Sequence, residues 1–481
     1  MSELAFETAG NLARMIRDRD VSSVELLELF IDRIARFDPV VHAVVTLDAD
    51  GARQDAQRAD RELAREGPRG PLHGVPMTIK DAFEVAGMRT TSGATRWRDH
   101  LPTRDAAAVQ RLRAAGAIIL GKTNVPAFCA DLQTYNSLFA TTNNPWDSAR
   151  TPGGSSGGAS AALAAGLTPM EIGSDVGGSI RTPSHWSGVC GHKPSFGLVS
   201  QRGHLPPAPG VLADTDLNVV GPLARAPEDL ALLLSILAEP PLGATDAQAL
   251  RLPAPRAPML SKYRVLTWFD DAEFSIDRGL RARLERLADD LRASGAEVVS
   301  HAPADGLGPI YRLYRALLDP IMAADLSPDA LSLLRASAAG SDGDDPLVQF
   351  ARHALIDHRQ WIALDRERAA LRRRFAHLFE HADVLLCPVN LLPAIHHDHS
   401  RMAAQRYVRV NGETRAYMDL MAWIAPATLC YLPATVVPLG LCDGLPVGVQ
   451  IVGPYFEDLT PIDFACRLAE LGCGFVRPPG F

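Results

Sequence analysis

Residues 153–197 read GGSSGGASAALAAGLTPMEIGSDVGGSIRTPSHWSGVCGHKPSFG. The first part is rich in glycine and serine and then in alanine. This order is typical of a loop that leads into a closely packed helix, because small side chains let backbones approach each other. A second glycine- and serine-rich segment, GGSIR, follows at 177–181. The stretch therefore predicts two tight loops that lie close together in the sequence.

Each loop contains a serine, and the simplest interpretation of each is a flexible turn. A phosphate-binding loop is excluded, because neither segment matches G-x-x-x-x-G-K-[ST] or a G-x-G-x-x-G that follows a strand. The surroundings of Ser179 also lack the G-x-S-x-G spacing of a nucleophile elbow. The glycines beside Ser179 would supply unblocked backbone N–H groups, which can converge on a developing oxyanion.

A nucleophilic serine needs a base, and several residues could supply one. Four histidines are candidates for a Ser-His-Asp triad, because triad order differs between folds: His73, His185, His192 and His204. Lys80 and Lys122 each end an apolar, strand-like run, and burial there would bring a lysine pKa toward neutrality. A surface pair of Lys80 with Asp81 is the alternative. The residues alone leave the base open.

The flanking sequence alternates between helical and strand patterns. Residues 8–66 look helical, with a capping box of Ser22 and Glu25 and with Pro39 expected to stop the helix. A strand is expected within 71–85, then a helix ending at Gly116 and a buried strand at 117–121. Similar patterns recur later: a connector at 240–258, a helix and strand at 278–299, helices at 304–360, and strands at 383–388, 433–440 and 444–453. This alternation predicts an α/β fold.

Composition excludes several classes of protein. The chain has 481 residues, 47% of them apolar and 22% charged, and carries a net charge of -8. That charge argues against nucleic acid as a partner. No apolar run approaches 18 residues and no signal peptide is visible, so no membrane partner is expected. The seven cysteines form no C-x-x-C pair, which favours reduced thiols and a cytoplasmic protein.

The segment 153–197 resembles the signature of the amidase signature hydrolases. Four more segments match that family: PLHGVPMTIKD (71–81), GKTNVPAF (121–128), NNPWD (143–147) and GLPVGVQIVGP (444–454). The resemblance extends from about residue 10 to 475 and is weakest in the centre. It implies a single domain over 1–481 with a large central mixed β-sheet flanked by helices on both faces. The signature core would occupy about 70–230 and the variable substrate region about 300–425.

The resemblance also implies a catalytic triad of two serines and a lysine. Ser179 would be the nucleophile that forms an acyl-enzyme. Ser155, after a cis peptide bond, would take the proton from Ser179 and pass it to Lys80, the base. Backbone N–H groups at four positions would form the oxyanion hole: Val176, Gly177, Gly178 and Ser179.

Four further residues are expected to support this triad. Asp175 and Arg181 flank the nucleophile loop and would brace it, as an ion pair or through loop N–H groups. Ser156 and Lys122 would orient the triad. The chemistry implied by the resemblance requires no cofactor and no metal. The run His396, His397, Asp398 and His399 could in principle hold zinc, but a loop at the surface or at the rim of a pocket is the preferred interpretation.

The implied substrate is a small-molecule amide with a hydrophobic or aryl group, because apolar and aromatic residues fill the variable region. Those residues could instead be simple helix packing. Phe128, Gln133 and Tyr135 are expected to contact the substrate, and the protein is expected to be a monomer or homodimer. His185, Trp186 and Cys190 depart from the commoner signature, so close relatives are a poor guide to the substrate.

Three alternatives to an amidase remain. A carbamate bond is close to an amide in its electronics, so a urethanase is one. The ammonia-supplying glutaminase component of glutamyl-tRNA amidotransferases is another, although its usual GSS-x-E-N-S run reads ADLQTYNSLFATTNNPWD here, which favours a stand-alone hydrolase. A binding protein without activity is disfavoured, because all three triad positions are filled.

Overall fold

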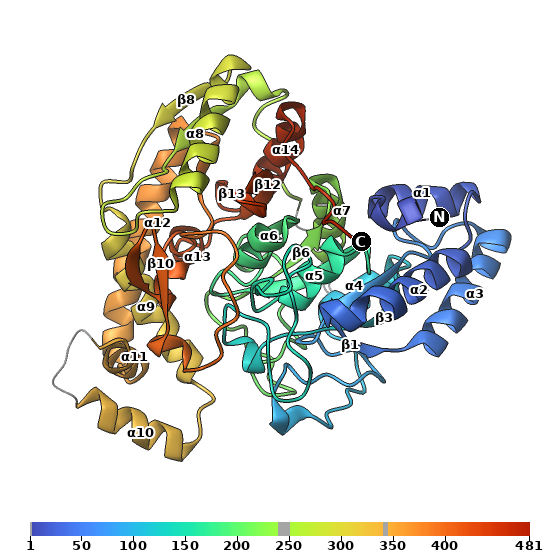
Figure 1. Cartoon of the computed structure of the whole chain (residues 1–481), viewed down its shortest axis with the longest axis horizontal. Helices are drawn as coiled ribbons and strands as arrows, with labels where there is room; N and C mark the ends of the chain where they lie inside the picture. Colours follow the sequence, from blue (N-terminus) through green and yellow to red (C-terminus); the bar gives the residue numbers. More distant parts are fainter. Residues whose placement is uncertain (1, 239–250, 340–344) are drawn as a thin grey trace.

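A computed structural model describes residues 2–238, 251–339 and 345–481 of the chain. It confirms the predicted α/β fold with a large mixed sheet (Figure 1). The eight strands of that sheet run in the order β4-β6-β5-β12-β13-β9-β7-β8. Their bounds are Met170–Asp175 (β4), Cys190–Lys193 (β5), Val219–Ala224 (β6), Arg264–Thr267 (β7), Glu297–Ser300 (β8), Val384–Pro388 (β9), Ala434–Cys442 (β12) and Leu445–Val452 (β13).

Two smaller sheets complete the β structure. Strands β1 (Val44–Leu47), β3 (Ile118–Thr123) and β2 (Pro76–Lys80) form one, and the hairpin of β10 (Tyr407–Val410) and β11 (Glu413–Ala416) forms the other. In the large sheet, strands from β4 to β9 pair antiparallel, whereas β9, β7 and β8 pair in parallel. The parallel pair β7 and β8 is joined through α8, as such a crossover requires.

The helices surround these sheets. Their bounds are Ala9–Asp18 (α1), Ser23–Val41 (α2), Ala49–Glu66 (α3), Ala107–Ala114 (α4), Gly157–Ala164 (α5), Arg181–Ser187 (α6), Pro227–Leu237 (α7), Arg278–Ala293 (α8), Leu307–Ala323 (α9), Pro328–Ala338 (α10), Pro346–Ala354 (α11), His358–His381 (α12), Ala425–Leu429 (α13) and Leu459–Arg467 (α14). None of the helices in the described residues is long and apolar enough to cross a membrane.

Strand β5 shows that helices cover both faces of the large sheet. Successive residues of a strand point to opposite faces. A Cβ added at Gly191 would meet the side chain of Ser184 in α6. The next residue, His192, contacts Asp458 at the start of α14. Helix α6 therefore lies on one face and α14 on the other.

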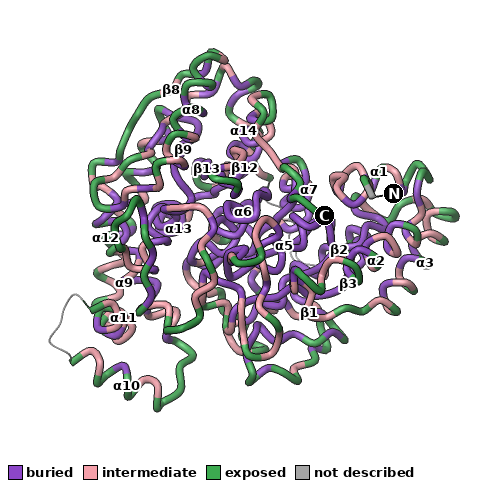
Figure 2. The backbone as a smooth tube through the Cα atoms, in the orientation of Figure 1, coloured by how far each residue is buried: buried purple, intermediate pink, exposed green. Residues whose placement is uncertain are grey.

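The centre of the molecule is packed around the glycine- and alanine-rich helix α5. Every residue of α5 and of α6 is buried, and the tube in Figure 2 is purple through both helices. A helix that is apolar on all sides fits this position, because it has no face toward water. At Gly158 an added Cβ would collide with the backbone of Asn124, just after β3. Glycine there allows α5 to approach the end of the smaller sheet.

Four expectations at the periphery need comment. The capping box of Ser22 and Glu25 is present. The helix that it starts continues through Pro39 to Val41, so the predicted stop at the proline was wrong. The helical region 8–66 is also interrupted by β1, which pairs with β3, a contact that local pattern could not reveal. The predicted connector 240–258 lies partly outside the described residues.

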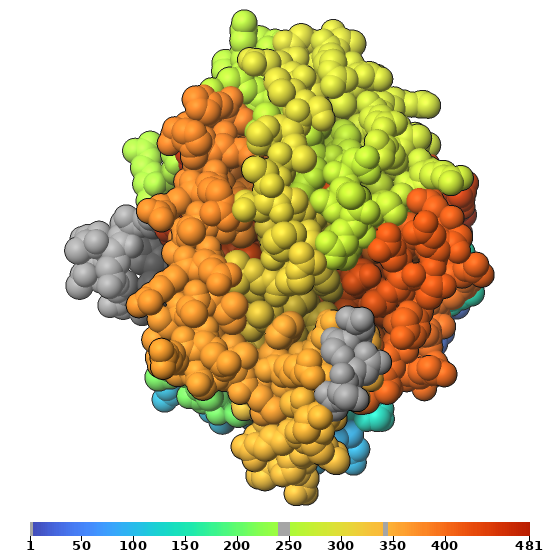
Figure 3. Space-filling view, turned by 90° about the vertical axis from the view of Figure 1, so that its left-hand side faces the viewer, coloured from blue at the N-terminus to red at the C-terminus, as the bar shows by residue number. Residues whose placement is uncertain are grey.

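A layer made of α9, α10, α11 and α12 covers one side of the molecule. Figure 3 views that side, where yellow to orange segments form much of the visible surface. Helix α9 carries the inner side of this layer, with Leu317 and Tyr314 fully buried. The layer of α9 to α12 thus lies opposite the signature core. It covers the turn that contains Ser179.

Candidate active site

The structure brings Lys80 and Ser155 together from separate elements. Lys80 is the last residue of β2, and Ser155 lies in the loop that leads into α5. Their side chains are hydrogen-bonded, with 2.7 Å between Lys80 Nζ and Ser155 Oγ. Lys80 Nζ also lies 2.9 Å from Ser174 Oγ at the end of β4. The peptide bond between Gly154 and Ser155 is cis.

Ser179 lies beside this pair in the turn between β4 and α6. Ser156, which follows Ser155, donates its backbone N–H to the carbonyl of Ser179 at 3.1 Å. Within the described residues, the hydroxyls of Ser155 and Ser179 are not hydrogen-bonded to each other, although both line one cavity. The Ser156 hydroxyl is buried without a partner in the described structure. The predicted triad positions therefore share one site, with one hydroxyl contact left to form.

Burial sets the protonation of Lys80. Its side chain is fully buried, and this desolvation lowers the pKa of Lys80, while Cys129, Asp175 and Glu171 act in the opposite direction. The surface pair with Asp81 is thus wrong. A lowered lysine pKa makes the neutral amine, the form that accepts a proton, easier to reach.

Asp175 and Arg181 form the predicted brace of the nucleophile turn. Arg181 donates two hydrogen bonds to the Asp175 carboxylate, at 3.0 and 2.8 Å, and both side chains are fully buried. The carboxylate also accepts the backbone N–H groups of Gly178 and Ile180. Burial by itself raises the pKa of Asp175, but the Arg181 charge and these hydrogen bonds outweigh it and lower the pKa to about 2. The turn is therefore held by a permanent ion pair.

Replacing Arg181 by methionine is expected to lower the free energy of unfolding by about 3–5 kcal/mol, because the Asp175 carboxylate would stay buried without its partner. Urea denaturation of both proteins measures the difference. Arg292→Met breaks the exposed pair with Asp289 and should leave the stability almost unchanged. An Arg181 variant as stable as its parent would show that the ion pair does not hold the turn.

One of the four N–H groups predicted to form an oxyanion hole already has an acceptor. The N–H of Gly178 donates to Asp175 at 2.9 Å, so Gly178 is removed from the set. Its φ of +89° is one that only glycine adopts easily, which explains the residue type. The N–H groups of Val176, Gly177 and Ser179 donate to no acceptor in the described part of the chain. Tyr314 donates its hydroxyl to the Val176 carbonyl at 2.9 Å and so fixes the orientation of the next peptide.

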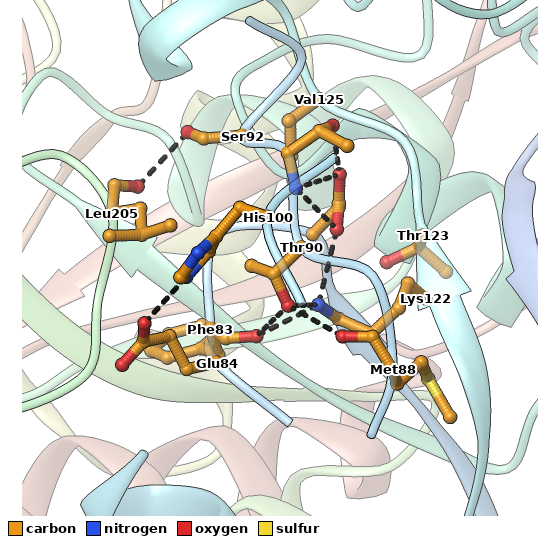
Figure 4. Close-up of polar contacts among 12 residues, drawn as sticks. Phe83, Glu84, Met88, Thr90, Ser92, His100, Lys122, Thr123, Val125 and Leu205 are labelled. Atoms are coloured by element: carbon orange, nitrogen blue, oxygen red, sulfur yellow. Dashed lines mark hydrogen bonds and ion pairs between the residues drawn. The ribbon is translucent and has the colours of Figure 1, made fainter. Parts of the chain in front are cut away.

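Lys122 is a structural residue. Its ammonium group donates to Asp81, to the Phe83 carbonyl and to Thr90 at 3.1, 2.8 and 2.9 Å (Figure 4). These three bonds use all three N–H groups of a protonated lysine. The side chain is fully buried and does not contact the serines. Lys122 joins the end of β3 to the loop after β2.

Of the four candidate histidines, His204 alone is linked to the triad. His73 bonds to the backbone of Arg69 and Ala59, and His185 bonds to Gly448. His192 contacts Thr435 and Asp458. His204 contacts Ser174, which in turn contacts Lys80. No triad with histidine as the base forms, because none of the four bonds to Ser179 or Ser155.

Two cavities meet at Ser179. The first, of about 250 Å³, is here called the apolar cavity, and the second, of about 380 Å³, the triad cavity. Leu318, Met322, Phe350, Met402, Met418 and Met421 line the apolar cavity. Ser155, Ser174 and His204 line the triad cavity together with Phe128, Ile321 and Met322. Ser179 therefore lies where an apolar chamber adjoins a chamber lined by Ser155, Ser174 and His204.

Two of the three predicted substrate contacts need correction. Phe128 lines the triad cavity. Gln133 is fully buried and binds the backbone of Asp398 through both ends of its amide. Tyr135 stacks on His399 and bonds to Asp131 and Arg406. Both side chains hold two loops together, and neither residue lines the two cavities. The segments that they join are more than 250 residues apart, a pairing that sequence pattern does not show.

The histidine run at 396–399 forms no set of metal ligands. His396 approaches the Ala149 carbonyl, and His399 stacks on Tyr135. Among the described residues, three converging His, Cys, Asp or Glu ligands occur in a single exposed group on α12: His377, Glu380 and His381. The run is part of the loop that Gln133 anchors.

Comparisons with known proteins agree with this fold. The model of the Amidase family matches residues 25–460. The A component of the glutamyl-tRNA(Gln) amidotransferase from Roseiflexus castenholzii is 32% identical over 491 aligned positions, covering 95% of this chain and 94% of that protein. A bacterial aryl acylamidase of the amidase signature enzymes has a TM-score of 0.79 and 25% identity, covering 96% of each chain. A structure described with the origins of an s-triazine catabolic enzyme has a TM-score of 0.81 and 27% identity, covering 98% of this chain and 100% of that one.

Proposed function

The chain belongs to the amidase signature family, and from this premise we propose that it is a stand-alone hydrolase of hydrophobic carboxylic acid amides. The observation that carries the proposal is the position of Ser179, between the apolar cavity and the cavity that holds Ser155 and Lys80. An acyl group fits the first, and proton transfer takes place in the second.

In the first half of the reaction, Ser179 Oγ attacks the amide carbonyl carbon. Its proton passes to Ser155, and Ser155 passes its own proton to the neutral amine of Lys80, 2.7 Å away. The carbonyl oxygen becomes an oxyanion, which the free N–H groups of Val176, Gly177 and Ser179 stabilise. The C–N bond then breaks, and the leaving nitrogen takes back the proton from Lys80 through Ser155. The products are a free amine and an ester of Ser179.

In the second half, water attacks that ester. Lys80 is neutral again and accepts the water proton through Ser155, and it returns the proton to Ser179 Oγ as the acid leaves. Lys80 thus carries one proton in each half of the reaction: from Ser179 to the leaving amine in the first, and from water to Ser179 Oγ in the second. The leaving nitrogen must receive its proton from Ser155, and this requirement determines the orientation of the substrate. The amine must lie on the side of Ser155, in the triad cavity, and the acyl group in the apolar cavity.

The lining of the apolar cavity indicates the substrate class. Its walls are methionine, leucine and phenylalanine side chains, and methionine adapts to irregular apolar groups. The charged residues that line it are paired: Arg315 with Asp319, and Asp131 with Arg406. An acyl group that carries charges would have to break a buried ion pair, whereas an alkyl or aryl acyl group would not.

A second candidate is a glutaminase of the kind suggested by the named relatives, which are about one third identical to the whole chain. Such an enzyme would release ammonia from glutamine and would need partner proteins. The paired charges of the apolar cavity disfavour it, since glutamine carries both an ammonium and a carboxylate group. A carbamate differs from an amide only beyond the carbonyl, so aryl carbamates remain a plausible side substrate.

A panel of substrates tests the proposal. We expect long-acyl and aryl-acyl anilides to be hydrolysed with kcat/KM at least tenfold higher than short aliphatic amides and glutamine, because burying each further methylene contributes about 0.8 kcal/mol. The rates of p-nitrophenyl esters and aryl carbamates complete the panel, and addition of EDTA should not change them. Glutamine as the best substrate would favour the amidotransferase function, and a general loss of activity with EDTA would contradict the metal-free mechanism.

A further inference from the structure

A chain of hydrogen bonds leads from Lys80 away from the serines. Lys80 Nζ lies 2.9 Å from Ser174 Oγ, and Ser174 Oγ lies 2.8 Å from His204 Nε2. His204 Nδ1 lies 2.9 Å from the carbonyl oxygen of Pro206. Ser174 and His204 are both buried, at 3% and 7% exposure. The mechanism proposed above uses neither of them.

The carbonyl at the end of this chain and the neutral state of the His204 ring together give the direction of each bond in it. A carbonyl oxygen can only accept, so Nδ1 of His204 must carry the proton. Burial and the nearby Lys80 lower the pKa of His204 to about 3, so the ring is neutral and its Nε2 is an acceptor. Ser174 must then donate its hydroxyl to Nε2. Only the oxygen lone pairs of Ser174 remain for Lys80, so Lys80 donates an N–H to Ser174.

We propose that His204, acting through Ser174, is a positioning residue that keeps the lone pair of the neutral Lys80 amine directed at Ser155. Because Ser174 can only accept from Lys80, it never competes with Ser155 as a donor to that lone pair. When Lys80 takes the proton, the Ser174 oxygen also stabilises the resulting ammonium group. This inference rests on the proposed function, since it assigns a task to groups next to its base.

The residues around His204 and Lys80 are compatible with the hydrogen bonds that link them through Ser174. The edge of the His204 ring packs against Phe83, with ring centroids 5.1 Å apart, and Phe83 and His204 form a β-bridge. The titratable groups that act on Lys80 are Cys129 after β3, and Asp175 and Glu171 on β4. Glu171 is itself bound by Thr78 and Thr123, and Asp175 by Arg181. Ser155 and Ser174 are therefore the direct hydrogen-bond partners of Lys80 Nζ within the described residues.

Two substitutions of His204 separate positioning from packing. His204→Phe keeps a ring against Phe83 but removes the acceptor for Ser174. His204→Gln loses the ring but places an amide oxygen where Nε2 was. If His204 positions Lys80, kcat of the phenylalanine variant should fall about 10- to 100-fold, with little change in KM. This loss is part of the roughly 10²- to 10⁴-fold acceleration that a positioned base supplies. The glutamine variant should stay within about threefold of the parent.

The pH profile gives a second readout. In His204→Phe the freed Ser174 hydroxyl can donate to Lys80 and stabilise the neutral amine, which lowers the pKa of Lys80 further. The acid limb of kcat/KM should therefore move to lower pH while the plateau falls. Ser174→Ala, a smaller change, should lower kcat and move the limb in the same direction. The double variant should lose little more than either single variant, because the two residues act in series.

The rate of labelling by an alkyl fluorophosphonate separates failure of this inference from failure of the proposed function. In that reaction Ser179 Oγ bonds to phosphorus, fluoride leaves, and the hydroxyl proton passes through Ser155 to Lys80. The inference is supported if the parent is labelled at Ser179, and if His204→Phe and Ser174→Ala are labelled at least tenfold more slowly. The control His73→Gln should be labelled at the parent rate. Equal labelling and an unchanged pH profile in those two variants, or a phenylalanine variant faster than the glutamine variant, would overturn the inference alone. A parent that is not labelled at Ser179 would overturn the proposed function as well.

Discussion

Replacing Ser179 by alanine is expected to reduce kcat for the best amide substrate on the order of 10⁶-fold, because the acyl-enzyme can no longer form. The fold should survive. The Ser179 hydroxyl faces the cavities and forms no hydrogen bond within the described structure, so its loss should change the free energy of unfolding by less than about 1 kcal/mol. Steady-state kinetics and urea denaturation measure the two quantities.

A neighbouring serine provides the matched control for that experiment. Ser184 is buried in α6, five positions along the chain, and donates to the Ile180 carbonyl at 2.8 Å. It lines neither cavity, so Ser184→Ala should retain the parent kcat. A Ser179→Ala enzyme with more than about 1% of the parent rate would contradict the assignment of the nucleophile, provided that contaminating parent enzyme is excluded by mass.

Replacing Lys80 by alanine has the second largest expected effect, a loss of roughly 10⁴-fold in kcat, at the upper end of what a positioned general base supplies. Lys80→Arg should be equally inactive, although it keeps the positive charge, because a guanidinium group cannot be deprotonated in a protein. This pair of variants distinguishes a base from a buried charge that only organises the site.

The pH dependence of the parent follows from the same assignment. Lys80 must be neutral to accept a proton, so activity rises with pH through the pKa of Lys80 and is lost below it. Burial lowers that pKa from the usual value for lysine. The acid limb of kcat/KM, the pH range in which activity falls as the solution becomes more acidic, should therefore lie below the pKa of an ordinary lysine. A limb that is unchanged in Lys80→Arg, or an arginine variant with the parent rate, would exclude lysine as the base.

The part of the site that lies within continuous motifs could be predicted from the sequence. Ser179, Asp175 and Arg181 are separated by few residues in one turn, and the resemblance to a known family placed Lys80 opposite Ser155. Gly178 was assigned to the oxyanion hole because a glycine next to the nucleophile leaves its N–H accessible. The structure shows that the Asp175 carboxylate takes that N–H, which depends on the geometry of the turn and not on residue type.

The contacts that could not be predicted are those between distant segments. Sequence pattern makes His204 one of four equal candidates, and it does not single out Ser174. Their link to Lys80 depends on how the loop after β5 folds back over the end of β4. Gln133 and Tyr135 are predicted as substrate contacts because residues 128–135 are expected to line the pockets together with the variable region. Their side chains instead bind residues 398–406, a loop whose place in the fold has no local signal. Sequence pattern reports period and residue type, whereas these contacts are set by tertiary packing.

Trapping the acyl-enzyme tests the central claim most directly. Parent enzyme is quenched with acid during turnover of a long-acyl anilide, digested with trypsin and analysed by fragmentation mass spectrometry. The nucleophile lies in the peptide from Thr151 to Arg181, which contains five serines, so fragmentation must separate Ser179 from Ser155 and Ser174. The account predicts the acyl mass on Ser179 in the parent and in no peptide of Ser179→Ala. An acyl group on another residue, or rapid turnover with no trapped acyl-enzyme while the Ser179→Ala protein remains active, would contradict it.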